Sequence, residues 1–319
     1  MIRTKAESSI ELVSINVSTD KGTTKTPVSE ATVAVDGIVG DAHAGNWGRQ
    51  VSLLSAESIE RFSAESDRST KPGDFAENLT LRGLDFALIR ILDRFRIGNV
   101  ELEVTQIGKA CHGSNCSIFR EVGKCVMPTE GVFCRVLSAG RIGLGDAVEY
   151  IPRTISCRIL TLSDRAYKGE YSDRSGPRIL ELLEDYCSET NWNLSVESTM
   201  LPDSADALRT ELTEAKDAGL SVVITTGGTG VGPRDITPDV AAGICDKLIP
   251  GIMDHIRLKF GARNPRALLS RSIAGVAGKT LLYTLPGSVR AVEEYMGEIL
   301  PTLEHLIFTI QGLDTHGSR

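Results

Sequence analysis

Short apolar runs separated by Gly and Asp dominate the chain up to Tyr150. The segment 100–105 places apolar residues on alternate positions, which is typical of a strand with one buried face. A helical pattern is clear only at 56–65, where Ser55 is suited to cap the N-terminus. Other predicted strands are 31–35, 50–54 and 131–137. Regularly spaced short strands predict a barrel or a sandwich-like sheet.

From Ser156 onward, apolar runs without alternation each lead into a loop and then a helix. Such runs are typical of parallel strands whose two faces are both covered by helices. The change of pattern predicts a domain boundary near Pro152, with one domain at 1–152 and the other at 153–319. The predicted strands of the second domain are 158–162, 221–226 and 280–285.

Composition narrows the class of protein. The 319 residues suffice for two domains of roughly 150 residues each. With 35 Lys and Arg against 42 Asp and Glu, the net charge of -7 argues against a nucleic-acid partner. We find no apolar signal segment at the N-terminus and no run approaching the ~20 apolar residues of a membrane span. Seven cysteines, an odd number, argue against a disulfide framework, so we expect a cytoplasmic protein with no membrane partner.

Three loops of the second domain should gather at the carboxyl edge of its sheet, where open α/β sheets bind ligands. The loop 225–239 is the most informative, because its glycines allow backbone N–H groups to approach an anion closely. Thr237 followed by Pro238 predicts an N-cap and the start of a helix whose N-terminus faces this loop. A phosphate-bearing ligand fits these features. The Gly-Lys-Ser/Thr of nucleotide P-loops is missing, and a plain tight turn is the alternative.

The same stretches resemble the molybdopterin adenylyltransferase and molybdopterin-binding family. The resemblance runs in order through residues 156–310 and implies a three-layer α/β domain with a mostly parallel sheet. It also implies that this domain binds the pterin phosphate, transfers AMP to it from MgATP, and forms trimers. The motifs that carry the resemblance are Thr161–Ala166, Tyr171, Asp173, Gly176–Pro177, Thr226–Gly230, Arg234–Asp239, Ile249–Gly251, Leu269–Arg271 and Leu285–Gly287.

Two aspartates match the catalytic positions of that family. Asp203 follows Pro202 after a strand, and Asp235 lies in the Arg-Asp-x-Thr-Pro element. In adenylyl transfer the protein supplies positioning and charge neutralisation, mostly through Mg²⁺ and its carboxylates, so we expect both aspartates to hold Mg²⁺. Either one could instead be a loop or capping residue, and Asp164 could be a structural partner of an arginine. Expected phosphate and pterin ligands are Gly227, Gly228, Thr229, Gly230, Asp173, Ser175 and Ser288.

The first domain carries a second resemblance, over most of residues 10–150. The segments 37–43 and 72–79, which contain Gly-Asp-x-His and Pro-Gly-x-Phe-x-Glu-Asn, resemble the MOSC domain, named for the C-terminal part of molybdenum-cofactor sulfurases. The resemblance implies a β-rich, barrel-like fold and a reactive cysteine after the Val-Thr-Gln strand. That residue is Cys111, which would carry sulfur or meet the molybdenum cofactor, with Lys109 and His112 favouring its thiolate.

Alternatives remain open for the first domain. Cys111 could be an inert, buried residue. His43 could be a ligand or a base, or simply a partner of Asp41. A zinc or iron–sulfur site could be built from Cys111, Cys116, Cys125 and Cys134, although their spacing contains no C-x-x-C.

We therefore expect a cytoplasmic, two-domain enzyme of molybdenum-cofactor biosynthesis, with other proteins of that pathway as partners. Its C-terminal domain would adenylate molybdopterin, and its MOSC domain would bind the cofactor or carry sulfur. The alternatives are a carrier that binds molybdopterin without turnover and a sulfurtransferase that depends on Cys111. The residues do not distinguish molybdenum from tungsten.

Overall fold

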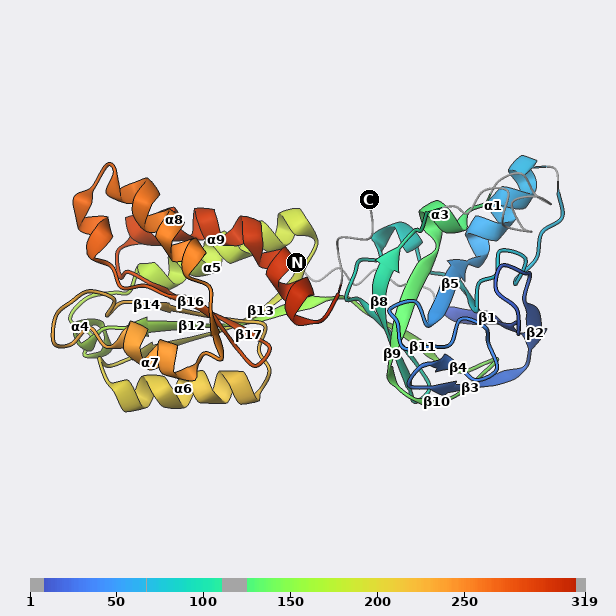
Figure 1. The fold of residues 1–319 in the computed structure, drawn as a ribbon, viewed down its shortest axis with the longest axis horizontal. Coiled ribbons are helices and arrows are strands. Elements are labelled where there is room, and N and C mark those ends of the chain that lie inside the picture. Colours follow the sequence, from blue (N-terminus) through green and yellow to red (C-terminus); the bar gives the residue numbers. More distant parts are fainter. Residues whose placement is uncertain (1–8, 67, 111–124, 314–319) are drawn as a thin grey trace. The chain divides into compact units, whose positions relative to one another are not determined.

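The computed structural model describes residues 9–66, 68–110 and 125–313. The chain forms two compact units, the first ending at Arg153 and the second beginning at Thr154 (Figure 1). Each unit has its own apolar core, so the two are described separately.

The N-terminal unit is built on a curled, mostly antiparallel sheet. Its described strands pair in the order β11-β7-β8-β9-β5-β6-β1-β2, and β10-β3-β4 form a second, smaller sheet. Ile10, just before β1, bridges Val148 in β11, so the sheet curls until its two sides meet. The strands are β1 (Glu11–Val17), β2 (Thr26–Val28), β3 (Glu30–Ala34), β4 (Gly37–Ile38), β5 (Val51–Ser55), β6 (Leu79–Arg82), β7 (Arg94–Ile97), β8 (Val100–Ile107), β9 (Val132–Ser138), β10 (Gly140–Gly143) and β11 (Val148–Ile151). This arrangement confirms the predicted β-rich, barrel-like fold.

Local patterns in this unit behave as predicted. Val100, Leu102 and Val104 of β8 are buried in the core, as their alternation indicates. Helix α1 (Ala56–Ser66) follows β5 directly, and the Ser55 hydroxyl accepts a hydrogen bond from the Ser58 N–H at 2.9 Å. The predicted N-cap is therefore confirmed. The short elements of this unit are η1 (Phe86–Leu88) and α3 (Met127–Glu130).

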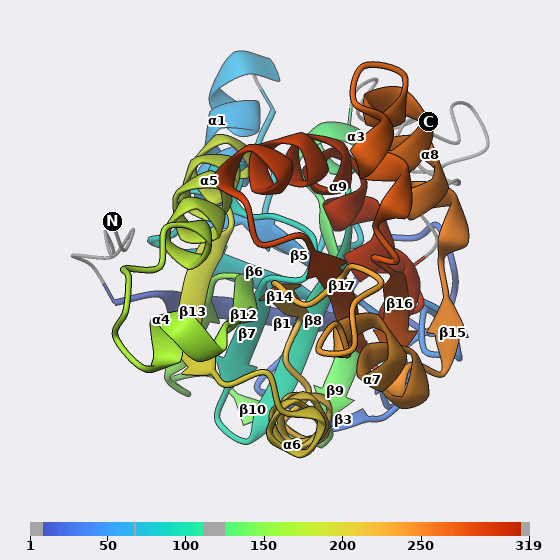
Figure 2. The same cartoon turned by 90° about the vertical axis from the view of Figure 1, so that its left-hand side faces the viewer.

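The C-terminal unit has three layers, as the family resemblance implies. Its described strands pair in the order β13-β12-β14-β17-β16-β15, with the first four parallel to one another. Helices α5, α8 and α9 lie on one side of this sheet, and α6 and α7 lie on the other (Figures 1 and 2). The strands are β12 (Thr154–Leu162), β13 (Asn193–Leu201), β14 (Val222–Thr226), β15 (Lys247–Leu248), β16 (Ala274–Ala277) and β17 (Thr280–Leu285). The helices are α4 (Asp164–Tyr167), α5 (Ser175–Thr190), α6 (Ala205–Asp217), α7 (Thr237–Ile244), α8 (Pro250–Gly261), η3 (Pro265–Leu269) and α9 (Val289–Ile310).

Two strands of this sheet, β15 and β16, had no counterpart in the predicted set, and β13 was expected only as the strand before Asp203. Strands β16 and β17 form an antiparallel hairpin whose two-residue loop contains Gly278 at φ +62°. The apolar runs on both sides of this loop are short. Their pattern in the sequence therefore did not indicate that β16 runs antiparallel to β17. The sheet is therefore mixed, with a parallel centre.

The register of the parallel strands decides where their loops begin. Leu162 pairs with Leu201, Thr161 pairs with Thr226, and Thr226 pairs with Leu285. The loops that follow β12, β13, β14 and β17 therefore start at one edge of the sheet, the edge at which ligands bind in such folds. Within the part of the chain described here, no helix is long and apolar enough to cross a membrane.

Candidate active site

A polar cavity of about 370 Å³ opens at the carboxyl edge of the parallel strands. Asp203 and Asp235 both line it, although they belong to loops after different strands. The predicted ligands Gly228, Asp173 and Ser175 line it as well. Among the described residues that form its wall, we do not find Gly227, Thr229, Gly230 or Ser288. Further lining residues are Thr161, Leu162, Ser163, Asp164, Arg165, Tyr171, Thr226, Gly232, Pro233, Arg234 and Gly287.

Asp203 is joined to Asp164 across the ends of β13 and β12. The Asp203 N–H donates to Asp164 Oδ1 at 3.0 Å, and the Asp164 N–H lies 3.5 Å from Asp203 Oδ2. Helix α6 is capped by Ser204, whose hydroxyl accepts from the Ala207 N–H. Capping of α6 therefore does not account for the Asp203 carboxylate, which is left at the cavity wall.

The glycine loop, residues 227–235, leaves a row of backbone donors unpaired. Gly227 donates its N–H to the Leu285 carbonyl at 2.9 Å, so that N–H is not available to a ligand. The N–H groups of Gly228, Thr229 and Gly230 donate to no acceptor within the described residues. Consecutive unpaired N–H groups form a concave site that favours an anion. The tip of the loop is Val231, whose surface is 75% exposed.

Asp235 closes this loop. Its Oδ2 accepts the Gly232 N–H at 2.8 Å, and its own N–H donates to the Gly232 carbonyl at 3.0 Å. Gly230 passes so close that a Cβ there would lie 2.7 Å from Asp235 Oδ2. The absence of a side chain at position 230 therefore allows the loop to fold against this carboxylate.

The prediction that Thr237 is the N-cap of α7 was wrong. Ile236 occupies the cap position, and Thr237 is the first residue of the helix. The Thr237 hydroxyl instead donates to the Gly227 carbonyl at 2.9 Å, and its N–H donates to the Gly228 carbonyl at 3.1 Å. These two bonds tie Thr237 to the glycine loop. Helix α7 therefore begins beside that loop, as predicted, although Thr237 is not its N-cap.

Asp173 and Ser175 tie the loops together as well as lining the cavity. Asp173 Oδ2 accepts from the Thr161 hydroxyl at 2.7 Å, and Oδ1 accepts from the Ser175 N–H at 2.9 Å. The Ser175 hydroxyl donates to the Gly287 carbonyl at 2.8 Å. Ser288 caps α9, where it accepts from the Ala291 N–H. These bonds give Asp173, Ser175 and Ser288 a structural role in the loops and in α9. Their role as ligands stays a prediction.

Charges of both signs surround the cavity. Arg234, which belongs to the glycine loop, places its Nη1 3.9 Å from Asp164 Oδ2. Arg165 stacks over the Tyr171 ring at 5.3 Å, and the Tyr171 hydroxyl is 2.9 Å from the Ser163 hydroxyl. Carboxylates suit a divalent cation, whereas arginines suit phosphate oxygens. The reasoning from sequence did not single out Arg234 or Tyr171 as site residues.

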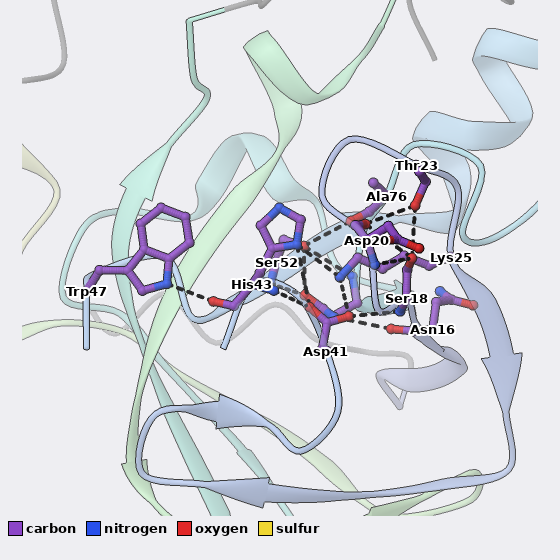
Figure 3. Close-up of polar contacts among 11 residues, drawn as sticks. Asn16, Ser18, Asp20, Thr23, Lys25, Asp41, His43, Trp47, Ser52 and Ala76 are labelled. Atoms are coloured by element: carbon purple, nitrogen blue, oxygen red, sulfur yellow. Dashed lines mark hydrogen bonds and ion pairs between the residues drawn. The ribbon is translucent and has the colours of Figure 1, made fainter. Parts of the chain in front are cut away.

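A second polar cluster lies inside the N-terminal unit (Figure 3). The Lys25 ammonium is 2.5 Å from Asp41 Oδ2, and these side chains are 1% and 0% exposed. His43 Nδ1 lies 3.3 Å from the same ammonium and 3.5 Å from Asp41 Oδ1, and the His43 side chain is 24% exposed. Burial alone would raise the pKa of Asp41, but the hydrogen bonds from His43 and Lys25 outweigh it and hold the pKa well below its usual value. Burial lowers the pKa of Lys25 despite its bond to Asp41.

The Pro-Gly-x-Phe-x-Glu-Asn motif supports this cluster from behind. Gly73, at φ +91°, accepts the Lys25 N–H at 2.8 Å, and a Cβ at position 73 would collide with the Lys25 carbonyl. Glu77 Oε1 accepts the Gly73 N–H at 2.6 Å, whereas its buried Oε2 has no hydrogen-bond partner among the described residues. Burial raises the pKa of Glu77 to about 7. Lys25 itself was missed from sequence, because nothing local marks a lysine that will be buried.

The predictions that involve Cys111 lie partly outside the described residues. Cys111, His112 and Cys116 are not described, and the described part contains no group of three or more His, Cys, Asp or Glu side chains arranged to hold a metal. Cys134 is fully buried in β9, where burial raises the pKa of its thiol far above the usual value. That position argues against Cys134 as a metal ligand.

Two known protein families match the chain, one in each of its two units. The profile described as "Probable molybdopterin binding domain" matches residues 158–305, and the MOSC domain profile matches residues 40–149. A molybdopterin adenylyltransferase of Helicobacter pylori (strain J99) is 34% identical over 161 residues, which is 50% of this chain and 90% of the relative. The chain therefore belongs to the molybdopterin-binding domain family through its C-terminal half, and the MOSC profile matches residues 40–149 of its N-terminal half.

Two further matches cover the same half. A molybdenum cofactor biosynthesis bifunctional protein of Chlorobaculum tepidum is 33% identical over 172 residues, and the match spans 53% of this chain and 52% of that protein. A solved structure described as "anomalous substructure of MogA" is 37% identical, and the match covers 49% of this chain and 99% of that structure at a TM-score of 0.45.

Proposed function

We propose that the C-terminal unit transfers AMP from MgATP to molybdopterin. The observation that carries the proposal is one cavity lined by Asp203, Asp235 and Gly228, the first residue of a row of unpaired N–H groups. Relatives that share this half are described as molybdopterin adenylyltransferases, which supports the assignment. In the reaction, a pterin phosphate oxygen attacks the α-phosphorus of ATP, the new P–O bond forms, and pyrophosphate leaves.

Mg²⁺ fits the residues that are present. This ion is usually held by one or two protein carboxylates together with water and substrate phosphates, so it needs no complete protein cage. Among the described residues, Asp203 Oδ1 and Asp235 Oδ1 accept no hydrogen bond, and both carboxylates line the cavity. These two aspartates would hold Mg²⁺, which neutralises charge on the reacting phosphates when it is bound.

The protein's own groups would do the rest by positioning. The N–H groups of Gly228, Thr229 and Gly230 would bind phosphate oxygens, as would the guanidinium of Arg234. Asp173 and Ser175 would meet the pterin phosphate while holding the loops in place, and the exposed Ser288 would reach the pterin from outside. Because the chemistry is largely positioning and electrostatics, small displacements of these groups should change the rate strongly.

The test is AMP transfer with purified full-length chain, MgATP and molybdopterin. Asp203→Ala and Asp235→Ala should each abolish transfer and pyrophosphate release, while pterin affinity stays within a few fold. The matched control is Asp206→Ala, which should keep full activity. Asp206 lies in the first turn of α6, just after Asp203, and its side chain is 96% exposed. Equal loss of pterin binding in both site variants would show that the aspartates shape the pocket. Pterin binding without pyrophosphate release by the wild type would favour the carrier.

For the N-terminal unit, we propose binding of the anionic molybdenum cofactor or transfer of sulfur through Cys111. Support comes from the MOSC family match and from cations around the buried cluster. Lys21 and Arg49 lie 5.5 and 4.8 Å from the Trp47 ring, which stacks against His43. Cofactor binding should be weakened by Arg49→Met, and a persulfide on Cys111, found by mass spectrometry, would establish the sulfurtransferase.

We also propose that the protein self-associates through its C-terminal unit, as a trimer in the cytoplasm with other proteins of the pathway. Exposed leucines support self-association, since large apolar side chains at the surface favour contact between chains. They belong to β15, α8 and η3: Leu248, Leu258, Leu268 and Leu269. The described cysteines form no disulfide, which suits a reducing compartment. Sedimentation equilibrium tests the trimer.

A further inference from the structure

Arg271 binds both sides of the glycine loop from outside the cavity. It follows η3, and its backbone N–H donates to the Thr229 carbonyl at 2.9 Å. Its Nε donates to the Gly230 carbonyl at 2.7 Å, and its Nη2 donates to the Asp235 carbonyl. Its Nη1 lies 2.8 and 2.9 Å from the two carboxylate oxygens of Asp239 in α7. One side chain thus connects the start of the loop, its end and the helix that follows.

The geometry of the guanidinium explains why an arginine is needed. Its N–H groups lie in one plane at fixed angles, so the carbonyls of Gly230 and Asp235 are held at a fixed separation. A lysine ammonium has the charge but not this planar fork. The Arg271 and Asp239 side chains are 37% and 66% exposed, and exposed ion pairs contribute little stability. The contacts with the two carbonyls are therefore the part of the arrangement that matters for the shape of the loop.

We infer that Arg271 is a positioning residue that sets the loop around Asp235 for binding the nucleotide's phosphates and magnesium. It does not line the cavity, so it acts through the loop rather than on the substrate. By fixing the Gly230 and Asp235 carbonyls, it holds the unpaired N–H groups of Gly228–Gly230 at a set distance from the Asp235 carboxylate. This inference rests on the proposed AMP transfer and adds the residue that shapes its nucleotide side.

Arg257 provides a matched control. Its guanidinium also binds two carbonyls, those of Ser270 and Ser272, and the carboxylate of Asp254. These carbonyls flank Arg271 along the chain, but they are not part of the glycine loop. Both carbonyls of this control are bound by Nη1, whereas Arg271 reaches its two carbonyls through Nε and Nη2. Arg257→Lys therefore removes a guanidinium with the same classes of partner from a neighbouring place, without touching the glycine loop.

The experiment measures MgATP affinity by calorimetry, then kcat, the Mg²⁺ requirement, pterin affinity and Tm for the full-length chain. For Arg271→Lys we expect kcat to fall about tenfold or more and MgATP to bind more weakly, because a small misplacement at a reacting centre is costly. Half-maximal activity should need several-fold more Mg²⁺, while pterin affinity and Tm should match those of Arg257→Lys. Asp239→Asn keeps the contacts with the carbonyls and should be milder.

Three results separate this inference from its alternatives. Unchanged MgATP affinity and Mg²⁺ requirement in Arg271→Lys would overturn it. A fall in kcat that only follows a fall in Tm, with pterin and MgATP binding lost equally, would also overturn it, because the role would then be stability. If the wild type binds MgATP but transfers no AMP, the proposed function fails, while weaker MgATP binding by Arg271→Lys would still support the positioning role.

Discussion

Asp164 and Asp203 hold each other's backbone at the ends of two adjacent parallel strands. Each carboxylate faces the N–H of the other residue, at 3.0 Å in one direction and 3.5 Å in the other. Two negatively charged side chains are thereby kept at one side of the cavity. Arg234, 3.9 Å from Asp164, provides the nearby positive charge.

This exchange predicts different outcomes for two substitutions of Asp164. Asp164→Ala removes the acceptor for the Asp203 N–H, so Asp203 should move and AMP transfer should fall about tenfold or more. Asp164→Asn retains an oxygen acceptor and loses only the charge, so its loss should be smaller. Steady-state kinetics at saturating MgATP measures both. Equal losses in the two variants would mean that the charge of Asp164, rather than its hydrogen bond, is what the site requires.

Gly227 and Gly230 should respond differently to alanine. At position 227, φ is +104° and a Cβ would collide with the Leu162 backbone carbonyl, so Gly227→Ala should cost about 1–3 kcal/mol of stability or more. At position 230 the nearest atoms that a Cβ would meet belong to the Asp235 carboxylate, which is part of a side chain and can shift. Gly230→Ala should therefore lower activity with a small change in Tm. Thermal unfolding and AMP transfer, measured together, check the contrast.

Replacing one partner of the buried Lys25–Asp41 ion pair should strongly lower the free energy of unfolding. Lys25→Met leaves Asp41 charged and fully buried without its ammonium, and such losses cost about 3–5 kcal/mol. Adding Asp41→Asn should recover part of that cost. The chain has two tryptophans, Trp47 and Trp192, so a Trp192→Phe background makes fluorescence report on Trp47 alone. Urea unfolding in this background measures the effect, and an additive double variant would show that the pair is not coupled.

Glu77 should make the N-terminal unit less stable as pH rises. Its folded pKa is about 7 because of burial, against an ordinary value of 4.5. Between these two values the folded state holds a proton that the unfolded state has released, so rising pH favours unfolding. The contribution is on the order of 3 kcal/mol at most. The difference in unfolding free energy between wild type and Glu77→Gln should fall from pH 4.5 to pH 7 and then level off; a constant difference would contradict the assignment.

The fold was largely predictable because its main helices and strands each have a recognisable pattern in the local sequence. Alternation marked β8, unbroken apolar runs marked β12, β14 and β17, and Ser55 marked the start of α1. Glycines and aspartates after strand ends indicated the edge at which the cavity is found. The domain boundary at residue 152 stays a prediction, as do the roles of Asp203 and Asp235.

What the sequence did not reveal depends on partners far away along the chain. Arg271 binds carbonyls 36 and 41 residues earlier, and Lys25 pairs with Asp41, 16 residues later. No local pattern distinguishes such an arginine or lysine from an exposed one, because burial and partner choice are fixed only when the sheets assemble. The N-cap assigned to Thr237 was wrong because its hydroxyl donates to the Gly227 carbonyl within the same loop and does not cap α7.

The exposed tip of the glycine loop makes the molecule convenient to observe. Val231 is largely exposed, and the bonds of Asp235 and Arg271 that close the loop go to other residues. A cysteine at 231 bearing an environment-sensitive dye would sit within a few residues of the arriving phosphates without replacing any of their ligands. Occupancy of the pocket could then be followed in real time by a change in emission, independently of turnover.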